Sequence, residues 1–382
     1  MSATKVTSRA EALDAHPARR ELQAALIALL AAIAIGSVLM LIVGRSPAHV
    51  WWQMVTRTIG EPYNLGQVLY KATGLALTGL SVSIALDAGL FNIGAEGQVT
   101  AGVLACSTVG TALPAGTPAV IAIPLCVLAA AAAGGLVGAA IGGLKVLRNA
   151  HEVITSIMLN AIVAGITLYL GNRVIFVGGS TTGAAIAAGA QLPKLGLGGT
   201  SANASIAIAA LAVAVVWWLR SQTTWGQAWR AVGESPEAVR TTGTSVGRVQ
   251  LMVMIGSGAL AGLAATNFVM GHKYAFEEGL GRGFGIAGIT AALLGRLQPL
   301  GVVAAALLLG FFSTGGLAVS DLVPKELTEM LQGVIVLAVA VAGPWVRKLE
   351  SEASPRAGAG GGTERRRSPE GDAEDEKMAA SK

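Results

Sequence analysis

Long apolar segments separated by short polar stretches dominate the chain. A helix needs roughly 20 apolar residues to cross the ~30 Å hydrocarbon layer of a bilayer with its backbone polar groups satisfied. The pattern predicts ten membrane-spanning helices, at residues 22–44, 66–88, 93–113, 118–145, 152–176, 204–220, 250–271, 284–297, 299–319 and 327–346. The eighth segment is short, so we expect it to be broken or re-entrant.

Composition agrees with this pattern. Hydrophobic residues make up 53% of the 382 residues, and charged residues only 13%. Soluble domains carry about 25% charged residues. The predicted fold class is therefore an all-α polytopic membrane protein. Gly134, Gly138 and Gly142 recur at four-residue spacing on one helical face, which is typical of helices whose backbones pack closely in a membrane.

Both ends of the chain differ from its middle. Residues 1–21 and 347–382 lack apolar periodicity, and we expect the second stretch to be disordered. The transmembrane domain is predicted at 22–346.

The distribution of basic residues predicts the orientation in the membrane. With the amino terminus inside, Lys and Arg residues near span ends are nearly twice as numerous on the inner side, which places both tails and the loop 221–248 in the cytoplasm. We therefore attribute the pI near 9.4 to membrane orientation and expect no nucleic-acid partner.

The loop 221–248 contains the signals of a short helix with marked ends. Ser235 can cap the first amides, Pro236 suits the first helical position, and Glu237 favours the positive end of the helix dipole. Gly243 can end the helix in a left-handed conformation. Such a helix can dock into a groove of another protein, with Ala238, Val239 and Thr242 as a flat contact surface. The alternative is a solvated loop in which the helix is incidental.

The chain lacks the sequence motifs of a nucleotide-binding site and of a metal site. No G-x-x-x-x-G-K-[ST] phosphate-binding loop occurs, so we expect no nucleotide site, no cofactor and no enzymatic activity in this chain. Four scattered histidines give no metal-ligand spacing, and no metal is expected. Cys106 and Cys126 lie in apolar runs and are interpreted as small buried hydrophobic residues rather than a disulfide.

Polar residues follow Asp87 at the end of the second predicted span. Asn92, Glu96 and Gln98 lie among glycines that would let a helix break and expose its backbone to a cavity. They are candidate residues of a substrate pathway. The alternative is a structural or gating turn at the cytoplasmic boundary, where polar residues cost little.

Asn160 and Asn267 lie inside apolar spans and are further pathway candidates. Their amides suit a solute that presents hydroxyls and ring edges. The alternative is a hydrogen bond between helices, worth on average about 0.6 kcal/mol in a membrane. At the entrance of the fifth span, His151 and Glu152 follow Arg148, and there we expect a local ion network rather than a proton relay.

Four stretches together resemble a known family. They are FNIGAEGQ at Phe91–Gln98, HEVITSIMLN at His151–Asn160, AVGESPEAVRTTG at Ala231–Gly243, and GRGFGIAGITAALLGRLQPLG at Gly281–Gly301. In these the chain resembles the permease subunits of bacterial ATP-binding-cassette importers, in the branched-chain amino acid and simple-sugar group, and most closely the nucleoside and guanosine-type members. The resemblance covers about residues 22–346.

The resemblance implies function and partners. It implies a permease of the bacterial inner membrane that moves nucleosides inward by alternating access, driven by ATP used in a separate ATPase. A binding lipoprotein outside and a second, related permease are the other implied partners. The residues that match the coupling segment are Gly233, Glu234, Ser235, Pro236, Glu237, Ala238, Arg240 and Gly243. The chain departs from the family at His151, where Asn is frequent, and at Gly285, where Asp is common.

Two alternatives remain open from the sequence. The same machinery could carry a simple sugar such as ribose, or a branched-chain amino acid. An ion-coupled secondary transporter would need no ATPase, but the chain lacks the mid-membrane acidic residues typical of such a relay.

Overall fold

The computed structural model describes residues 30–31, 33–176 and 180–324, together with 326, 330 and 333–334. The predicted tails at 1–21 and 347–382 lie outside the described residues. So do the start of the first predicted span and most of the tenth, 327–346.

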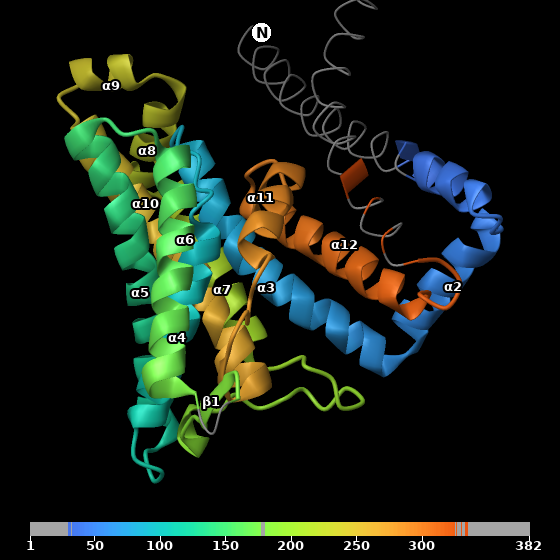
Figure 1. Ribbon diagram of the computed structural model, residues 1–382. Coiled ribbons are helices and arrows are strands. Elements are labelled where there is room, and N and C mark those ends of the chain that lie inside the picture. The colour runs from blue at the N-terminus through green and yellow to red at the C-terminus, as the bar shows by residue number, and fades with distance from the viewer. Residues whose placement is uncertain are drawn as a thin grey trace, which may run out of the picture. The chain divides into compact units, whose positions relative to one another are not determined.

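The described part of the chain is mostly helical (Figure 1). The helices are α2 (Pro47–Gly60), α3 (Pro62–Asp87), α4 (Ala95–Ala112), α5 (Ala119–Arg148), α6 (Glu152–Leu170), α7 (Ser205–Gln222), α8 (Thr224–Glu234), α9 (Pro236–Thr241), α10 (Val246–Ala265), α11 (Phe284–Leu294) and α12 (Pro299–Ala318). The π-helical segments η1 (Gly171–Ile175) and η3 (Thr266–Lys273) follow α6 and α10, and η2 (Ala188–Ala190) is a 3₁₀ turn.

Two short strands form the sheet at the end of the bundle opposite α8 and α9 (Figure 1). Strand β1 (Thr182–Ala185) runs antiparallel to β2 (Ala275–Glu277). Thr182 lies opposite Glu277 and Ala185 opposite Ala275, with an irregularity between the two pairs. The strands link the segment after α6 to the segment after α10.

Within the described residues, six helices are long and apolar enough to cross a membrane. The count is seven if the helices Ile33–Ile42 and Pro47–Gly60, which meet at 117°, form one broken span. This confirms a polytopic helical membrane protein but not the predicted count of ten. Helix α4 falls outside the six because it carries Glu96 and Gln98 in its first turns. Helix α11 has only 11 residues and is roughly 16 Å long, as expected for a broken segment.

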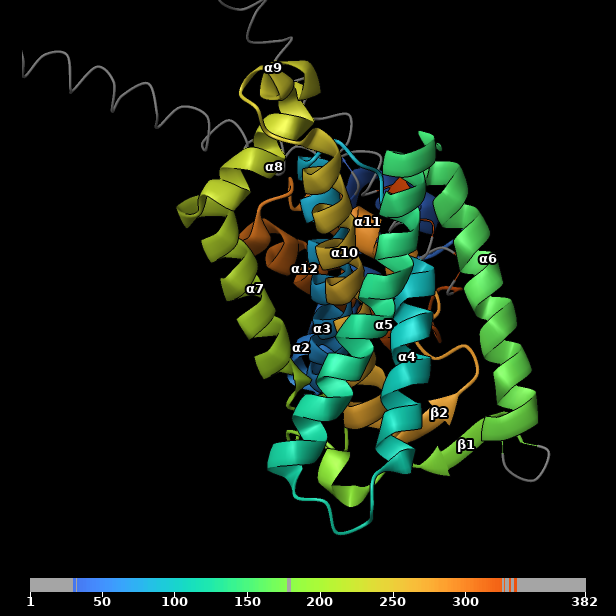
Figure 2. The same cartoon turned by 90° about the vertical axis from the view of Figure 1, so that its left-hand side faces the viewer.

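Helix α3 occupies the centre of the bundle. It contacts α2, α4, α7, α10, α11 and α12. Its most apolar stretch is 83% buried, whereas that of α6 is 17% buried. Helix α6 therefore runs along the outside (Figure 2), and many of its apolar side chains are exposed.

A line of glycines brings α5 and α10 into backbone contact. A Cβ atom at Gly134 would collide with the carbonyl oxygen of Gly258, and one at Gly138 with the carbonyl oxygen of Met254. On the other helix, a Cβ at Gly262 would meet the carbonyl of Ala130. The close packing predicted from the glycine spacing is confirmed, because only glycine leaves room for the neighbouring backbone.

Candidate functional site

The polar loop 221–248 folds into two short helices between α7 and α10. Ser235 accepts a hydrogen bond from the Ala238 amide at 3.4 Å, and Pro236 occupies the first helical position. Glu237 lies in the first turn, and Gly243 has φ +81°. The capped helix predicted from these residues is therefore present as α9, preceded by the second helix, α8.

Helix α8 rests directly on the end of α3. A Cβ atom at Gly233 would collide with the Asp87 carbonyl oxygen, and one at Gly89 would lie 3.3 Å from the Gly233 Cα. Glycine at these positions lets the two backbones touch. The segment that carries α9 is thus attached to the central helix of the bundle.

The exposed surface of α9 differs from the one we expected. Val239 is buried in the same cluster as Val232 and Val246. It holds α9 against the bundle and does not contribute to a flat contact surface with Ala238 and Thr242. The residues left exposed around α9 are Glu234, Ser235, Pro236, Glu237, Ala238, Arg240, Thr241, Thr242 and Gly243.

An ion pair connects α7 to the same end of α3. The Arg220 Nε donates to Asp87 Oδ2 at 2.7 Å, and its Nη1 donates to Gln298 Oε1 at 2.7 Å. The Asp87 side chain is only 9% exposed. Arg220 thereby ties α3, α7 and the turn before α12 together beneath α8. Sequence reasoning missed this pair, since 133 residues separate its members.

The residues between α3 and α4 fold back into the bundle. Asn92 and Gln98 are fully buried and exchange two hydrogen bonds, of 2.9 and 3.1 Å. The Asn92 amide also donates to Ser257 Oγ at 2.6 Å, and Ser257 bonds the Ser81 carbonyl at 2.7 Å. These contacts join α3, α4 and α10. We term Ser81, Asn92, Gln98 and Ser257 the amide network.

Glu96 and Asn160, two other predicted pathway residues, line a cavity of about 260 Å³. The Glu96 carboxylate accepts the amides of Gly283 at 2.5 Å and Gly285 at 2.9 Å. These amides begin α11, where the helix dipole favours negative charge. Asn160 accepts the Gly97 amide at 2.8 Å.

The sequence departure at Gly285 has a structural counterpart. A Cβ atom there would lie 2.5 Å from the Glu96 Cα. The structure thus leaves no room for an Asp side chain at 285, and Glu96 provides the carboxylate at the start of α11.

Asn267, the last predicted pathway residue, is fully buried and lies away from both cavities. Its Oδ1 accepts from Asn203 and from the Ser205 hydroxyl, both at 2.9 Å. Its amide donates to the Tyr70 carbonyl at 3.0 Å. Asn267 therefore joins η3 to α3 and to the start of α7.

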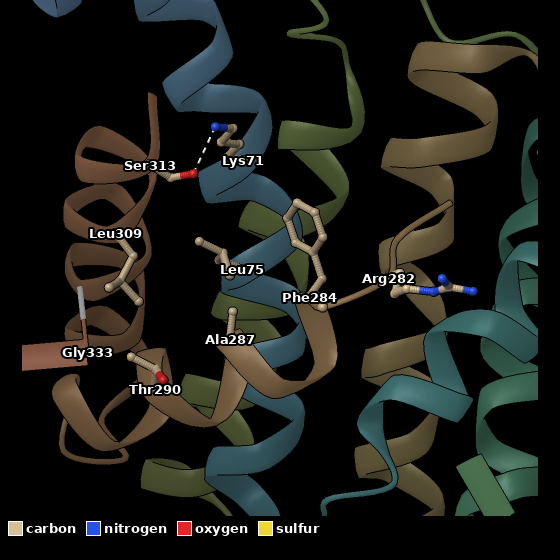
Figure 3. A pocket seen from close by; sticks show the side chains of 10 residues that line it. Lys71, Leu75, Arg282, Phe284, Ala287, Thr290, Leu309, Ser313 and Gly333 are labelled. Carbon is tan, nitrogen blue, oxygen red and sulfur yellow. Dashed lines mark hydrogen bonds between the residues drawn. The ribbon is translucent and has the colours of Figure 1, made fainter. Parts of the chain in front are cut away.

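A second cavity, of about 370 Å³, lies between α3, α11 and α12. Figure 3 shows Lys71 bonded to Ser313 at its upper end, with Leu75 and Leu309 facing each other below. Phe284 lies beside Leu75 at the start of α11. Sequence reasoning missed Lys71, which is an isolated charge within an apolar span.

Three smaller expectations concern local chemistry. Glu152 pairs with Lys145 at 2.8 Å, so the ion pair at this span entrance involves a residue outside the expected group of Arg148, His151 and Glu152. Cys106 and Cys126 are both buried and free, as expected. In the described part of the chain, no three His, Cys, Asp or Glu side chains are grouped in a way that would hold a metal ion.

Comparison with known proteins gives consistent matches. The chain is 37% identical over 322 residues to the guanosine ABC transporter permease protein NupP of Bacillus subtilis, covering 82% of this chain and 92% of that one. It is 33% identical to the glucose ABC transporter permease protein TsgB13 of Haloferax volcanii (81% and 85% covered). It is 28% identical to the nucleoside ABC transporter permease protein NupB of Lactococcus lactis subsp. cremoris (84% and 91% covered).

No solved structure matches significantly. The sequence profile of one family matches residues 64–340, which span α3 to α12 and both cavities. The chain therefore belongs to the family described as the branched-chain amino acid transport system permease component.

Proposed function

We propose that the chain is the membrane-spanning subunit of an ATP-binding-cassette importer that moves nucleosides into the cytoplasm. Its family and the two relatives named for guanosine and nucleosides support this cargo. The location is the bacterial inner membrane, with the lipid bilayer around the exposed apolar faces of helices such as α6. No nucleic acid takes part.

The energy comes from a separate ATPase on the cytoplasmic side. The chain itself binds no cofactor and is not an enzyme, which accords with the missing phosphate-binding loop. The other partners are an extracytoplasmic substrate-binding lipoprotein and a second, related permease that forms a heterodimer with this chain.

The proposed topology has ten spans with both tails in the cytoplasm. Its support is the arrangement in Figure 1, where α8 and α9 lie at one end of the bundle and β1 lies at the other. The sequence adds support, because Lys and Arg near the predicted span ends are more numerous on the predicted inner side, which is the side of the loop 221–248.

One observation carries the proposal: α9 is exposed, while α8 beside it rests on the central helix. Force applied to α9 passes through Gly233 to Asp87 at the end of α3, and through Arg220 to α7. Helix α3 then extends to Lys71 in the second cavity, roughly 24 Å away. A rigid helix thus connects the docking surface to the interior.

The solute pathway includes both cavities, which share Arg282 and flank the segment that precedes α11. In this proposal Glu96 and Asn160 contact the solute. Asn92, Gln98 and Asn267 line neither cavity, and their hydrogen bonds hold the helices around the pathway.

The coupling role is tested by Glu234→Leu and Arg240→Leu in the complete transporter. Both side chains are exposed, so the variants should insert normally. We expect ATP hydrolysis to continue while uptake falls about tenfold or more. A loss of roughly 1.4 kcal/mol in the free energy of docking between α9 and the ATPase lowers the docking equilibrium constant tenfold. Arg248→Leu, an exposed charge at the start of α10, is the matched control. Normal uptake by both variants would contradict the coupling role.

Sidedness is tested with Ala238→Cys. The native Cys106 and Cys126 are buried, so an impermeant thiol reagent should report mainly on residue 238. Labelling in inside-out vesicles but not in intact cells is expected. Labelling from outside intact cells would overturn the topology.

The relative named for glucose supports a second cargo. Uptake of labelled guanosine in competition with glucose, ribose and leucine separates these cargoes. Uptake that collapses with the ion gradient and persists without the ATPase would instead identify a secondary transporter.

A further inference from the structure

The cavity between α3, α11 and α12 contains a lysine in the interior of a membrane span. Lys71 lies roughly 14 Å along α3 from its first residue. Ionisable side chains are rare at such depth and usually face a partner or an aqueous pathway. Lys71 lines the cavity and is half-buried.

The bonds of Lys71 leave donors unused. Among the described residues its one hydrogen-bond partner is the Ser313 hydroxyl, at 2.8 Å, and no carboxylate there pairs with it. An ammonium group has three donors and no acceptor. Two donors therefore remain for a ligand.

An aromatic ring forms another wall of the cavity. Phe284 lies with its ring centre 4.7 Å from that of the buried Phe268. A Cβ atom at Gly74 would lie 2.8 Å from the Phe284 ring, so α3 also holds the ring in place. With Leu75 and Leu309 nearby, the cavity offers flat apolar walls beside a cationic donor (Figure 3).

The lining limits which ligands fit. The cavity of about 370 Å³ lies within the range of small-molecule sites, roughly 300–1,000 Å³. Among the residues that the structure describes around the cavity, none is acidic. An amino acid would pair its carboxylate with Lys71 but leave its ammonium without an anion. A ligand with a flat ring and two adjacent hydrogen-bond acceptors would pack against the apolar walls and accept from the free donors of Lys71.

We propose that this cavity binds the base of a 6-oxopurine nucleoside, with Lys71 donating to O6 and N7 and Phe284 packing against the ring. The inference rests on the proposed nucleoside cargo. A 6-oxopurine presents two neighbouring acceptors, whereas adenine presents the N7 acceptor beside its N6 donor. Because an ammonium cannot accept, the adenine amino group would meet donors only.

The test compares uptake of labelled guanosine and adenosine by the complete transporter with wild-type chain, Lys71→Arg and Lys71→Gln. The binding protein is the same throughout, so a change in the uptake ratio arises in this chain. Arginine also bonds O6 and N7 of guanine, whereas glutamine bonds N6 and N7 of adenine. We expect K71R to keep the preference for guanosine and K71Q to shift the ratio toward adenosine by about 5- to 150-fold.

Lys194→Gln is the matched control, because Lys194 is exposed and lies outside both cavities. The ratio of guanosine to adenosine uptake by the Lys194→Gln variant should equal that of wild type. If K71Q transports both nucleosides with an unchanged ratio, or if K71R and K71Q lose both equally, the inference is overturned while the nucleoside importer stands. If wild type transports neither nucleoside but takes up glucose or leucine, the proposed cargo fails as well.

Discussion

The amide network and the Lys71 cavity are both polar regions inside the helical bundle, yet they differ in how their hydrogen bonds are met. Asn92 and Gln98 are fully buried and bond each other, and Asn92 also donates to Ser257. Lys71 has one protein bond, to Ser313, and faces a cavity. A polar group whose bonds are met within the protein holds helices together, whereas one with free donors beside a cavity is available to a solute.

The largest expected effect concerns the amide network. Asn92→Leu leaves the buried Gln98 side chain without its partner, and such an orphaned group costs about 1–3 kcal/mol. It also removes one bond of Ser257, which keeps its bond to the Ser81 carbonyl. We expect a clear fall in unfolding temperature of the purified protein in detergent. Asn172→Leu, at an exposed asparagine, is the control. Equal unfolding temperatures in both variants would mean that the network does not stabilise the bundle.

A double-mutant cycle sharpens this result. If the two amides act as a pair, Asn92→Leu combined with Gln98→Leu costs less than the sum of the single changes. Residues in one hydrogen-bond network show interaction energies of about 0.5–3 kcal/mol. Additive losses of unfolding free energy would indicate that the two side chains stabilise the bundle independently.

Glu96 shares features with both the amide network and the Lys71 cavity, since it lines a cavity and also bonds two backbone amides. Glu96→Gln keeps the shape but removes the charge at the start of α11, and its Nε2 cannot accept from one of the two backbone amides. We expect a loss of about 1–2 kcal/mol in unfolding free energy, from one hydrogen bond and the charge–dipole interaction together. A much larger loss would place Glu96 with the amide network.

The smallest expected effect on stability is that of Lys71→Met. Only one hydrogen bond is lost, and a cation no longer lies in apolar surroundings. We expect the unfolding temperature to stay close to that of wild type while nucleoside uptake falls. A drop in unfolding temperature as large as that of Asn92→Leu would show that Lys71 stabilises the bundle, and the amide network and the Lys71 cavity would then not differ in role.

Local signals predicted local structure well. Ser235, Pro236 and Gly243 specify the ends of α9, because capping depends on neighbours within one turn. The spacing of Gly134 and Gly138 predicted close helix packing but not the partner, α10. The burial of Val239 was missed, because six residues are too few to show which side of a helix faces the bundle.

Contacts between distant segments could not be predicted. Nothing local indicates that Arg220 pairs with Asp87, or that Glu96 bonds the start of α11. Asn92, Asn160 and Asn267 looked alike in the sequence. Only the fold shows that each of them joins distant segments and that Asn160 also lines a cavity.

The sequence by itself determined that the chain is a helical membrane protein, where α3 to α7 and α10 to α12 lie, and which polar segment carries α9. These features depend on hydrophobic length and on neighbours within a few residues. Only the tertiary structure decided that α3 is central, that α8 rests on its end, and that Lys71 faces a cavity with Phe284. Packing between helices far apart in the chain sets those relations, and an apolar helix carries little information about which neighbour it will meet.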